Sequence, residues 1–331
     1  MRRVLLPFAL ALAATATMGL EAQAATAAPT FRHYVALGDS FTAGPLIPWQ
    51  QSSWCFRSNN NYPSWLATKL GLYYTSGAFT DVSCSSADTM NMTASQVTPS
   101  PDVPMSTQPP QFDALRLDTD LVTIGIGGND YSVFGTLTGT CPTLRDSNPT
   151  GSPCRDHFTI NGVDTVSAAI VNTQKNLEDV IKGVRAHSPA AKIVMVGYPR
   201  LVPPTGTCPD VVPFATGDYA WVDSVERKLN AAVSTAARRQ GATYVDTYGP
   251  SLGHDACAGS AAWVAGQTTN VFAAAAYHPY QAGMKAEADL IYRALGGTTT
   301  TSTAIKPSGR KAATKAEVEA MARYAGEISA P

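Results

Sequence analysis

Short apolar segments alternate along this chain with helical patterns, and this alternation limits the fold more than any other feature. Between the apolar segments, apolar residues recur at a spacing of three and four over Val166–Val184 and over Tyr219–Ala236, as expected of helices. Alternation of strand, helix and strand predicts an α/β fold whose central parallel sheet is covered on both faces. The segments expected to be its strands, buried on both faces, are Tyr34–Leu37, Phe79–Ser83, Leu121–Ile126, Lys192–Val196 and Thr243–Val245.

The N-terminal segment has the features of a secretory signal peptide. Two arginines give it a positive start, Val4–Leu20 are mostly apolar, and small-residue cleavage motifs end at Ala24 and at Ala27. A transmembrane anchor is the alternative, but the apolar run is short and no later stretch is long and apolar enough to span a bilayer. We therefore expect residues 1–27 to be a signal peptide and the product to be secreted and extracellular, with no integral membrane segment after cleavage.

Two later segments depart from the alternation. Residues 131–162 contain glycine, proline, asparagine and a pair of cysteines, and form a long insertion after the third strand, where functional loops tend to occur. Residues 297–331 begin with a threonine run typical of a linker. We expect one folded domain over residues 28–296, followed by a threonine-rich linker and a polar C-terminal tail over 297–331.

Charge and cysteine content exclude some function classes. With 24 Lys and Arg against 25 Asp and Glu, the chain has no global attraction for polyanions, so we expect no nucleic-acid partner. The six cysteines include no C-x-x-C motif and no zinc-like spacing with histidine, so they predict disulfides and no metal site. Six cysteines allow fifteen pairings, and spacing alone does not choose among them, although Cys141 with Cys154 is favoured as a local pair.

Polar residues follow two of the expected strands at their carboxyl ends, where ligands bind in open α/β sheets. The first strand leads into Gly38-Asp39-Ser40-Phe41, and a serine on such a tight turn is held out of the core, as a nucleophile has to be. The third leads into Gly127-Gly128-Asn129-Asp130, whose Asn129 amide can donate to a developing oxyanion. Taken alone, each block is also typical of an ordinary turn. His278, at a loop-to-helix junction after the last strand, can face the same sheet edge as Ser40.

With these blocks in this order, the sequence resembles the SGNH hydrolases, also called GDSL lipases and esterases, and most closely their secreted actinobacterial branch. The resemblance covers roughly Tyr34–Leu295 and includes a further block, Cys84-Ser85-Ser86-Ala87. It implies a three-layer α/β/α flavodoxin-like fold, stapled by disulfides, and hydrolysis of carboxylic esters without a cofactor.

The resemblance also implies roles for single residues. Ser40 would be the nucleophile and His278 its general base. The oxyanion would be bound by the side-chain amide of Asn129 and by the backbone N–H groups of Ser40 and Ser86. In the secreted relatives the cysteines pair sequentially, which here implies the disulfides Cys55–Cys84, Cys141–Cys154 and Cys208–Cys257.

Two positions depart from the family pattern. Ser86 stands where the family usually has glycine, with Gly77 as a rival alignment; a backbone N–H survives this change, and a positive φ there would cost about 1 kcal/mol. Ala275 stands where the family usually has an aspartate, three residues before the catalytic histidine. We therefore expect a Ser–His dyad in which the imidazole of His278 is oriented by a backbone carbonyl, that of Ala275.

These features favour a secreted lipase or esterase, with phospholipids among the candidate substrates, that works through an acyl-enzyme and acts as a monomer on an ester or lipid. Leu46-Ile47-Pro48-Trp49 and Trp54 lie just beyond Ser40 and would either line an acyl pocket or pack in the core. A polysaccharide acetylesterase is the first alternative. A non-catalytic secreted binding protein on the same scaffold is the second, and it would lack a nucleophile, a base or an oxyanion donor.

Overall fold

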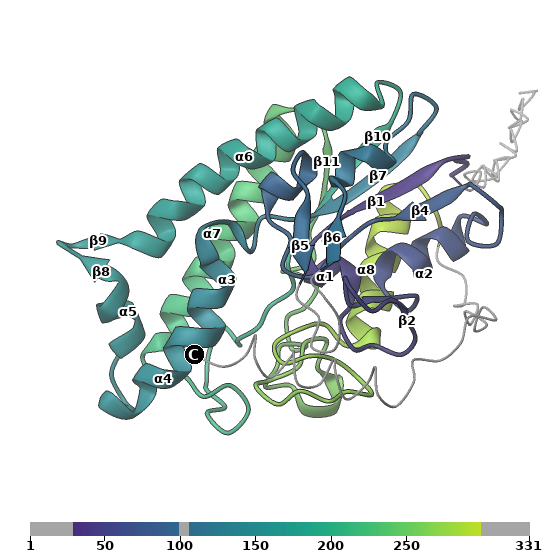
Figure 1. Cartoon of the computed structure of the whole chain (residues 1–331). Coiled ribbons are helices and arrows are strands. Elements are labelled where there is room, and N and C mark those ends of the chain that lie inside the picture. Colours follow the sequence, from purple (N-terminus) through teal and green to yellow (C-terminus); the bar gives the residue numbers. More distant parts are fainter. Residues whose placement is uncertain (1–28, 99–105, 299–331) are drawn as a thin grey trace, which may run out of the picture.

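The computed structural model of the chain describes residues 29–98 and 106–298 (Figure 1). The expected signal peptide, and the expected tail beyond its first two residues, lie outside these described residues. None of the described helices is long and apolar enough to cross a membrane.

A parallel sheet of five strands lies at the centre, in the spatial order β11-β10-β7-β1-β4. The strands are β1 (Tyr34–Gly38), β4 (Phe79–Asp81), β7 (Leu121–Gly125), β10 (Lys192–Val196) and β11 (Thr243–Val245). All five lie where the sequence predicts them. Counted along the chain this is the flavodoxin-like order 2-1-3-4-5, in which ligands bind at the carboxyl ends of the first and third strands.

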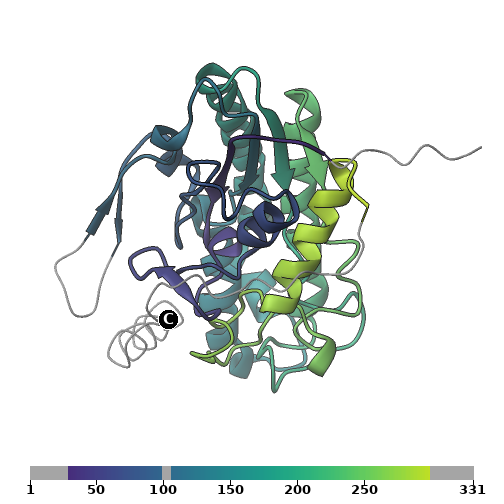
Figure 2. The same cartoon turned by 90° about the vertical axis from the view of Figure 1, so that its right-hand side faces the viewer.

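Helices cover both faces of the sheet, which confirms the three-layer prediction. On one face pack α6 (Thr165–His187) and α7 (Asp218–Arg239), and on the other α2 (Tyr62–Lys69) and α8 (Gln281–Ala294). Figure 2 looks at the sheet from the side of α2 and α8. Both long helices, α6 and α7, follow the predicted apolar periodicity, because the residues at that spacing are the ones they bury.

Successive residues of β1 belong to different cores. Val35 and Leu37 pack with the α6 and α7 side, whereas Tyr34 and Ala36 pack with the α2 and α8 side. Because both faces are buried, the strand reads as a continuous apolar run. The next polar residues of the chain therefore emerge only at the carboxyl end of the strand.

The remaining elements are short. The two-stranded antiparallel pairs are β2 (Gln50–Ser52) with β3 (Arg57–Ser58), β5 (Gln96–Thr98) with β6 (Ser106–Gln108), and β8 (Thr159–Ile160) with β9 (Val163–Asp164). The short helices are α1 (Ser40–Ala43), η1 (Thr89–Met92), η2 (Gln111–Ala114), η3 (Asp130–Ser132), α3 (Val133–Gly135), η4 (Thr136–Thr140), α4 (Cys141–Leu144), η5 (Arg145–Ser147), α5 (Pro153–Phe158) and η6 (Gly259–Ala261). The long insertion after the third strand is thus built mainly of short helices.

Three disulfides join the cysteines in sequential pairs, Cys55–Cys84, Cys141–Cys154 and Cys208–Cys257, as the family resemblance implies. The second staples α4 to α5 within the insertion. Each bond restricts the unfolded chain and thereby stabilises the fold.

Candidate active site

The turn that carries Ser40 is held rigidly. Gly38 ends β1, and a side chain there would collide with Thr42 and with the carbonyl oxygen of Gly125 on the neighbouring strand. The side chain of Gln111 clamps the same residue: its Oε1 accepts from the Gly38 N–H at 2.8 Å, and its Nε2 donates to the Gly38 carbonyl at 2.9 Å. Ser40 follows as the first residue of α1, which is capped by Asp39. Sequence reasoning missed Gln111, because nothing in its local sequence distinguishes it.

Ser40 and His278 are in hydrogen-bonding contact. Nε2 of His278 lies 2.8 Å from Oγ of Ser40, and Nδ1 lies 2.7 Å from the carbonyl oxygen of Ala276. Because a carbonyl only accepts, Nδ1 carries the proton and Nε2 is left as the acceptor for the serine. Within the described part of the chain, the imidazole makes no other hydrogen bond and meets no carboxylate.

The expectation for Ala275 is wrong. Its carbonyl accepts from the backbone N–H of His278 at 3.2 Å, so it is engaged in the local turn and does not orient the ring. Tyr277 has φ 61°, and this left-handed residue turns the chain so that the carbonyl of Ala276 reaches Nδ1 instead.

Aromatic residues surround the imidazole and lower its basicity. The rings of Phe41 and Phe134 lie 5.3 Å and 5.4 Å from that of His278, which is 8% exposed. This burial lowers the pKa of His278 to about 4, against a smaller raising effect of the hydrogen bond to Ala276. The imidazole is therefore neutral at pH 7 and able to accept a proton.

The loops carrying Ser86 and Asn129 are joined to one another. Nδ2 of Asn129 donates to the carbonyl of Ala87 at 2.9 Å, which leaves its second N–H free of that bond. Next to it, the carboxylate of Asp130 accepts from the backbone N–H and the hydroxyl of Thr89, at 2.9 Å and 2.8 Å. Ser86 has φ 65°, the positive value anticipated for a position where the family usually has glycine.

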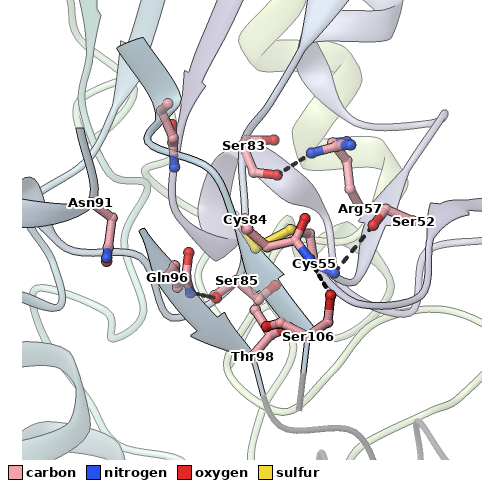
Figure 3. The surroundings of a disulfide bond; sticks show 12 residues. Ser52, Cys55, Arg57, Ser83, Cys84, Ser85, Asn91, Gln96, Thr98 and Ser106 are labelled. Atoms are coloured by element: carbon pink, nitrogen blue, oxygen red, sulfur yellow. Dashed lines mark hydrogen bonds between the residues drawn. A yellow bond between two sulfur atoms is a disulfide. The ribbon is translucent and has the colours of Figure 1, made fainter. Parts of the chain in front are cut away.

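The disulfide Cys55–Cys84 (Figure 3) fastens the loop that carries Ser86 beside the turn that carries Ser40. The N–H of Cys84 donates to the carbonyl of Gly38, and the N–H of Ser85 donates to that of Cys55, both at 3.0 Å. From β5, Nε2 of Gln96 donates to the carbonyl of Ser85 at 2.7 Å. The loops that follow β1, β4 and β7, which carry Ser40, Ser86 and Asn129, therefore meet at the same edge of the sheet.

The four candidate residues, Ser40, Ser86, Asn129 and His278, line one cavity that opens to solvent. Its remaining walls are largely apolar and come from Pro45, Leu46, Phe56, Phe134, Gly135, Ala275, Ala276 and Tyr277, with the hydroxyl-bearing Ser85 and Thr138. Of the segment Leu46–Trp49 only Leu46 lines the cavity; Ile47 packs in the core of α2 and α8. Trp54 is also absent from the lining.

The sequence model of the GDSL-like lipase/acylhydrolase family matches residues 36–286. The chain belongs to this family. Lipase 2 of Streptomyces coelicolor is 40% identical over 242 residues, which cover 72% of this chain and 76% of that protein. This GDSL hydrolase is thus a lipase or esterase with the SGNH fold.

Two solved structures resemble this hydrolase in both fold and sequence. Phospholipase A1 from Streptomyces albidoflavus NA297 has a TM-score of 0.61 and 28% identity, covering 81% of this chain and 98% of its own. The extracellular lipase from Streptomyces rimosus has a TM-score of 0.59 and 26% identity, covering 79% and 99%.

Nothing in the sequence predicts that two aromatic residues, Phe56 and Phe134, line the cavity of the hydrolase. Phe56 lies beside the disulfide cysteine Cys55, and Phe134 lies in the long insertion. A further histidine that could have competed for the site, His254, instead stacks on Trp263 and bonds the carbonyl of Ala261 at 2.6 Å. It belongs to the structure of its own loop.

Proposed function

We propose that this hydrolase cleaves carboxylic esters with a Ser40–His278 dyad and a covalent acyl-enzyme. The observation that carries the proposal is the 2.8 Å contact between Oγ and Nε2 inside the open cavity. As Oγ attacks the ester carbonyl carbon, Nε2 takes the serine proton, and it then gives this proton to the departing alcohol. Water hydrolyses the acyl-enzyme by the same proton transfers, with His278 again as the base.

The negative charge on the ester oxygen needs donors that are already in place. We assign this role to the free N–H of the Asn129 amide and to the backbone N–H groups of Ser40 and Ser86. Support comes from the hydrogen bond that orients Asn129 on Ala87, and from the presence of all three residues in the cavity wall. Ser86 supplies only backbone, so its side chain is not required for this function.

The apolar walls favour an acyl chain as the substrate group in the cavity. Leu46, Phe56 and Phe134 offer apolar surface well beyond what the methyl group of an acetyl ester fills. We therefore propose lipid esters, phospholipids among them, as the substrate class, in line with the phospholipase A1 activity that names one structural relative.

We further propose that the enzyme is secreted and acts outside the cell as a monomer. The signal-like N-terminal sequence, the three disulfides and the extracellular lipase among the structural relatives support secretion. Sizing of the purified protein by light scattering tests the monomer.

The test is a substrate series measured on the purified protein and on Ser40→Ala. p-Nitrophenyl esters of increasing acyl length, a phospholipid and acetylated xylan are the substrates. We expect turnover of the longer acyl esters and of phospholipid, loss of all turnover in the folded variant, and labelling of Ser40 by a serine-directed phosphonate. Turnover of acetylated xylan alone would make the enzyme an acetylesterase, and an active Ser40→Ala variant would remove Ser40 as the nucleophile.

A further inference from the structure

A single phenol hydroxyl connects the two strand ends that carry the nucleophile and the oxyanion donor. Tyr198 follows β10, and its OH donates to Oδ2 of Asp39 at 2.5 Å while accepting from the backbone N–H of Gly128 at 2.8 Å. Asp39 directly precedes Ser40, and Gly128 directly precedes Asn129. The hydroxyl of Tyr198 therefore bonds the residue directly before Ser40 and the residue directly before Asn129.

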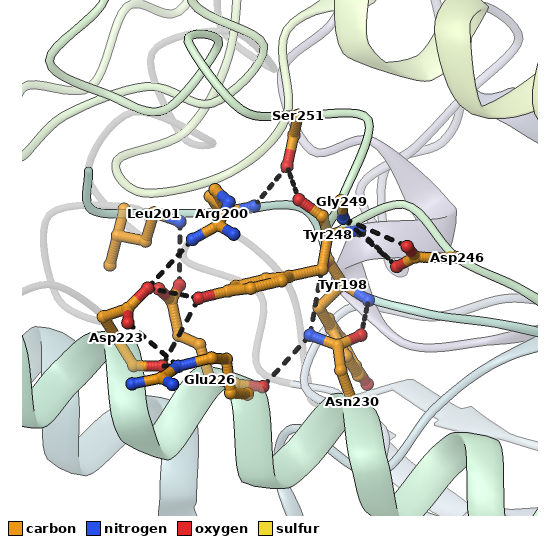
Figure 4. Close-up of polar contacts among 11 residues, drawn as sticks. Tyr198, Arg200, Leu201, Asp223, Glu226, Asn230, Asp246, Tyr248, Gly249 and Ser251 are labelled. Carbon is orange, nitrogen blue, oxygen red and sulfur yellow. Dashed lines mark hydrogen bonds and ion pairs between the residues drawn. The ribbon is translucent and has the colours of Figure 1, made fainter. Parts of the chain in front are cut away.

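The backbone of Tyr198 is fixed by a residue of α7. Oδ1 of Asn230 accepts from the N–H of Tyr198 at 2.8 Å, and Nδ2 of Asn230 donates to its carbonyl at 3.1 Å (Figure 4). The ring meets Phe41 edge-on, with centroids 5.2 Å apart, and Phe41 also contacts His278. Both ends of the side chain are thus held, and the residue is 6% exposed.

The strand ends are shaped for this bridge. A Cβ added to Gly128 would lie only 3.1 Å from the hydroxyl oxygen of Tyr198 and 3.2 Å from its ring, so the absence of a side chain lets the phenol approach. The two carboxylate oxygens of Asp39 have different partners: Oδ1 accepts from the N–H of Phe41 at 2.8 Å, and Oδ2 accepts from the hydroxyl of Tyr198. The hydroxyl uses its one proton on the carboxylate and a lone pair on Gly128.

We propose that Tyr198 is a positioning residue for ester hydrolysis, setting the distance between the nucleophile Ser40 and the oxyanion donor Asn129. This inference rests on the proposed function. Ser40 and Asn129 stand at the ends of different strands, β1 and β7, and have to be held to within a fraction of an ångström for attack and charge stabilisation to coincide. The strands themselves stay paired as far as the hydrogen bond from the N–H of Asp39 to the carbonyl of Gly125 at 2.9 Å. Without the hydroxyl, however, Oδ2 of Asp39 and the N–H of Gly128 both lose a buried partner, and the link between the two loops beyond this pairing is lost.

The test is Tyr198→Phe, which removes only the hydroxyl. Its matched control is Tyr34→Phe, a buried tyrosine whose OH bonds Thr123 at 2.7 Å in the core on the other face of the sheet. On a soluble p-nitrophenyl ester we expect kcat of Tyr198→Phe to fall at least about tenfold with KM within about twofold, while the control keeps its kcat. Thermal melting of both variants separates this effect from lost stability.

Unchanged kcat in a folded Tyr198→Phe protein would overturn the inference while leaving the proposed function intact, whereas an inactive wild type would remove the proposed function itself. If Tyr198→Phe does not fold, Gly128→Ala tests the same contact, because its Cβ pushes against the phenol. We expect the same loss of kcat at constant KM, and an unchanged kcat there would likewise overturn the inference.

Discussion

The imidazole of His278 lies 2.8 Å from the hydroxyl of Ser40, although 238 positions separate the two residues in the chain. The contact exists because β1 ends at the turn that carries Ser40, and because the loop before α8 returns to the same edge of the sheet. The backbone N–H of Ala275 donates to the carbonyl of Pro45 at 3.1 Å and ties these two loops together. The second ring nitrogen of His278, Nδ1, donates to the backbone carbonyl oxygen of Ala276.

The carboxylates of Asp246 and Asp255 are expected to be dispensable for chemistry. Asp246 accepts from the N–H groups of Tyr248 and Gly249, and Asp255 accepts from that of Cys257, so both cap local turns away from His278. Asp→Asn at either position should keep kcat within about twofold of wild type on a soluble ester. A carboxylate that orients the base is worth about 10⁴-fold in a serine hydrolase triad, so a loss of that size in a folded variant would reject the dyad.

Removing the proposed side-chain oxyanion donor, Asn129, should lower turnover and leave substrate binding nearly unchanged. Asn129→Ala deletes the amide, and we expect kcat to fall by about 10²–10³-fold with little change in KM. Asn129→Asp keeps the size but adds negative charge where the oxyanion forms, so its loss should be at least as large. Steady-state kinetics on a soluble ester measure both, and a loss in KM alone would assign Asn129 to substrate binding.

Two buried groups give the pH profile its expected shape. Burial lowers the pKa of His278 to about 4, so the neutral base persists far below pH 7. Burial raises the pKa of Asp39 to about 7, a rise opposed mainly by the hydrogen bond from Tyr198 and increased by the charge of Asp130. Burial, and to a smaller extent the charge of Asp39, raises the pKa of Glu287 in α8 well above the ordinary value.

Protonation of Asp39 places a proton on one of the two oxygens that accept from Phe41 and Tyr198 and so weakens the bond there, and we therefore expect kcat/KM to rise with pH through about 7. Asp39→Asn removes this titration, and the remaining acid limb should move down towards the pKa of His278, about 4. The same shift at His278 affects stability: the unfolded chain binds the proton first, so stability falls as the pH decreases from about 6.5 towards 4. An acid limb that stays near 7 in Asp39→Asn would assign it to another group.

Ser86→Gly is expected to preserve activity and to keep or raise stability. The residue has φ 65°, which costs a non-glycine residue about 1 kcal/mol, and this strain is relieved in glycine. Part of the gain is offset by the greater freedom of glycine in the unfolded chain. Denaturant unfolding and kcat of Ser86→Gly and Ser86→Ala measure both effects; a large loss of kcat in Ser86→Gly would show that the hydroxyl takes part.

Two of the three disulfides, Cys55–Cys84 and Cys141–Cys154, should differ in their effect on activity. Closing a loop of about fifteen residues stabilises by about 3 kcal/mol, and longer loops by somewhat more, so replacing either Cys55–Cys84 or Cys141–Cys154 by alanines should lower the Tm. Well below the Tm, only the first replacement should reduce kcat, because Cys84 adjoins Ser85 and Ser86 in the cavity wall. Equal kcat in the two double variants would mean that the hydrogen bonds of the loop suffice to place Ser86.

Much of the architecture follows from short-range pattern. The strands β1 and β7 are fully buried and mostly apolar, and a polar block begins where each of them ends, so the sequence places Ser40 and Asn129 at strand ends before any tertiary contact is known. The outer strands β4 and β11 are only partly buried. The periodicity of α6 and α7 follows in the same way from the face that each helix buries. The sequential pairing of the cysteines is predicted from the family resemblance, since the spacing of the cysteines alone does not distinguish among the fifteen possible pairings.

The sequence by itself determined the class of fold, the sheet edge that carries the site and the residue types that meet there, because strand burial and helical periodicity are local properties of the chain. Only the tertiary structure decided which carbonyl orients His278, that Phe134 and not Ile47 lines the cavity, and that Tyr198 bridges Asp39 and Gly128. These contacts depend on backbone angles at single residues and on packing between segments far apart in the chain. Neither leaves a periodic trace in the sequence.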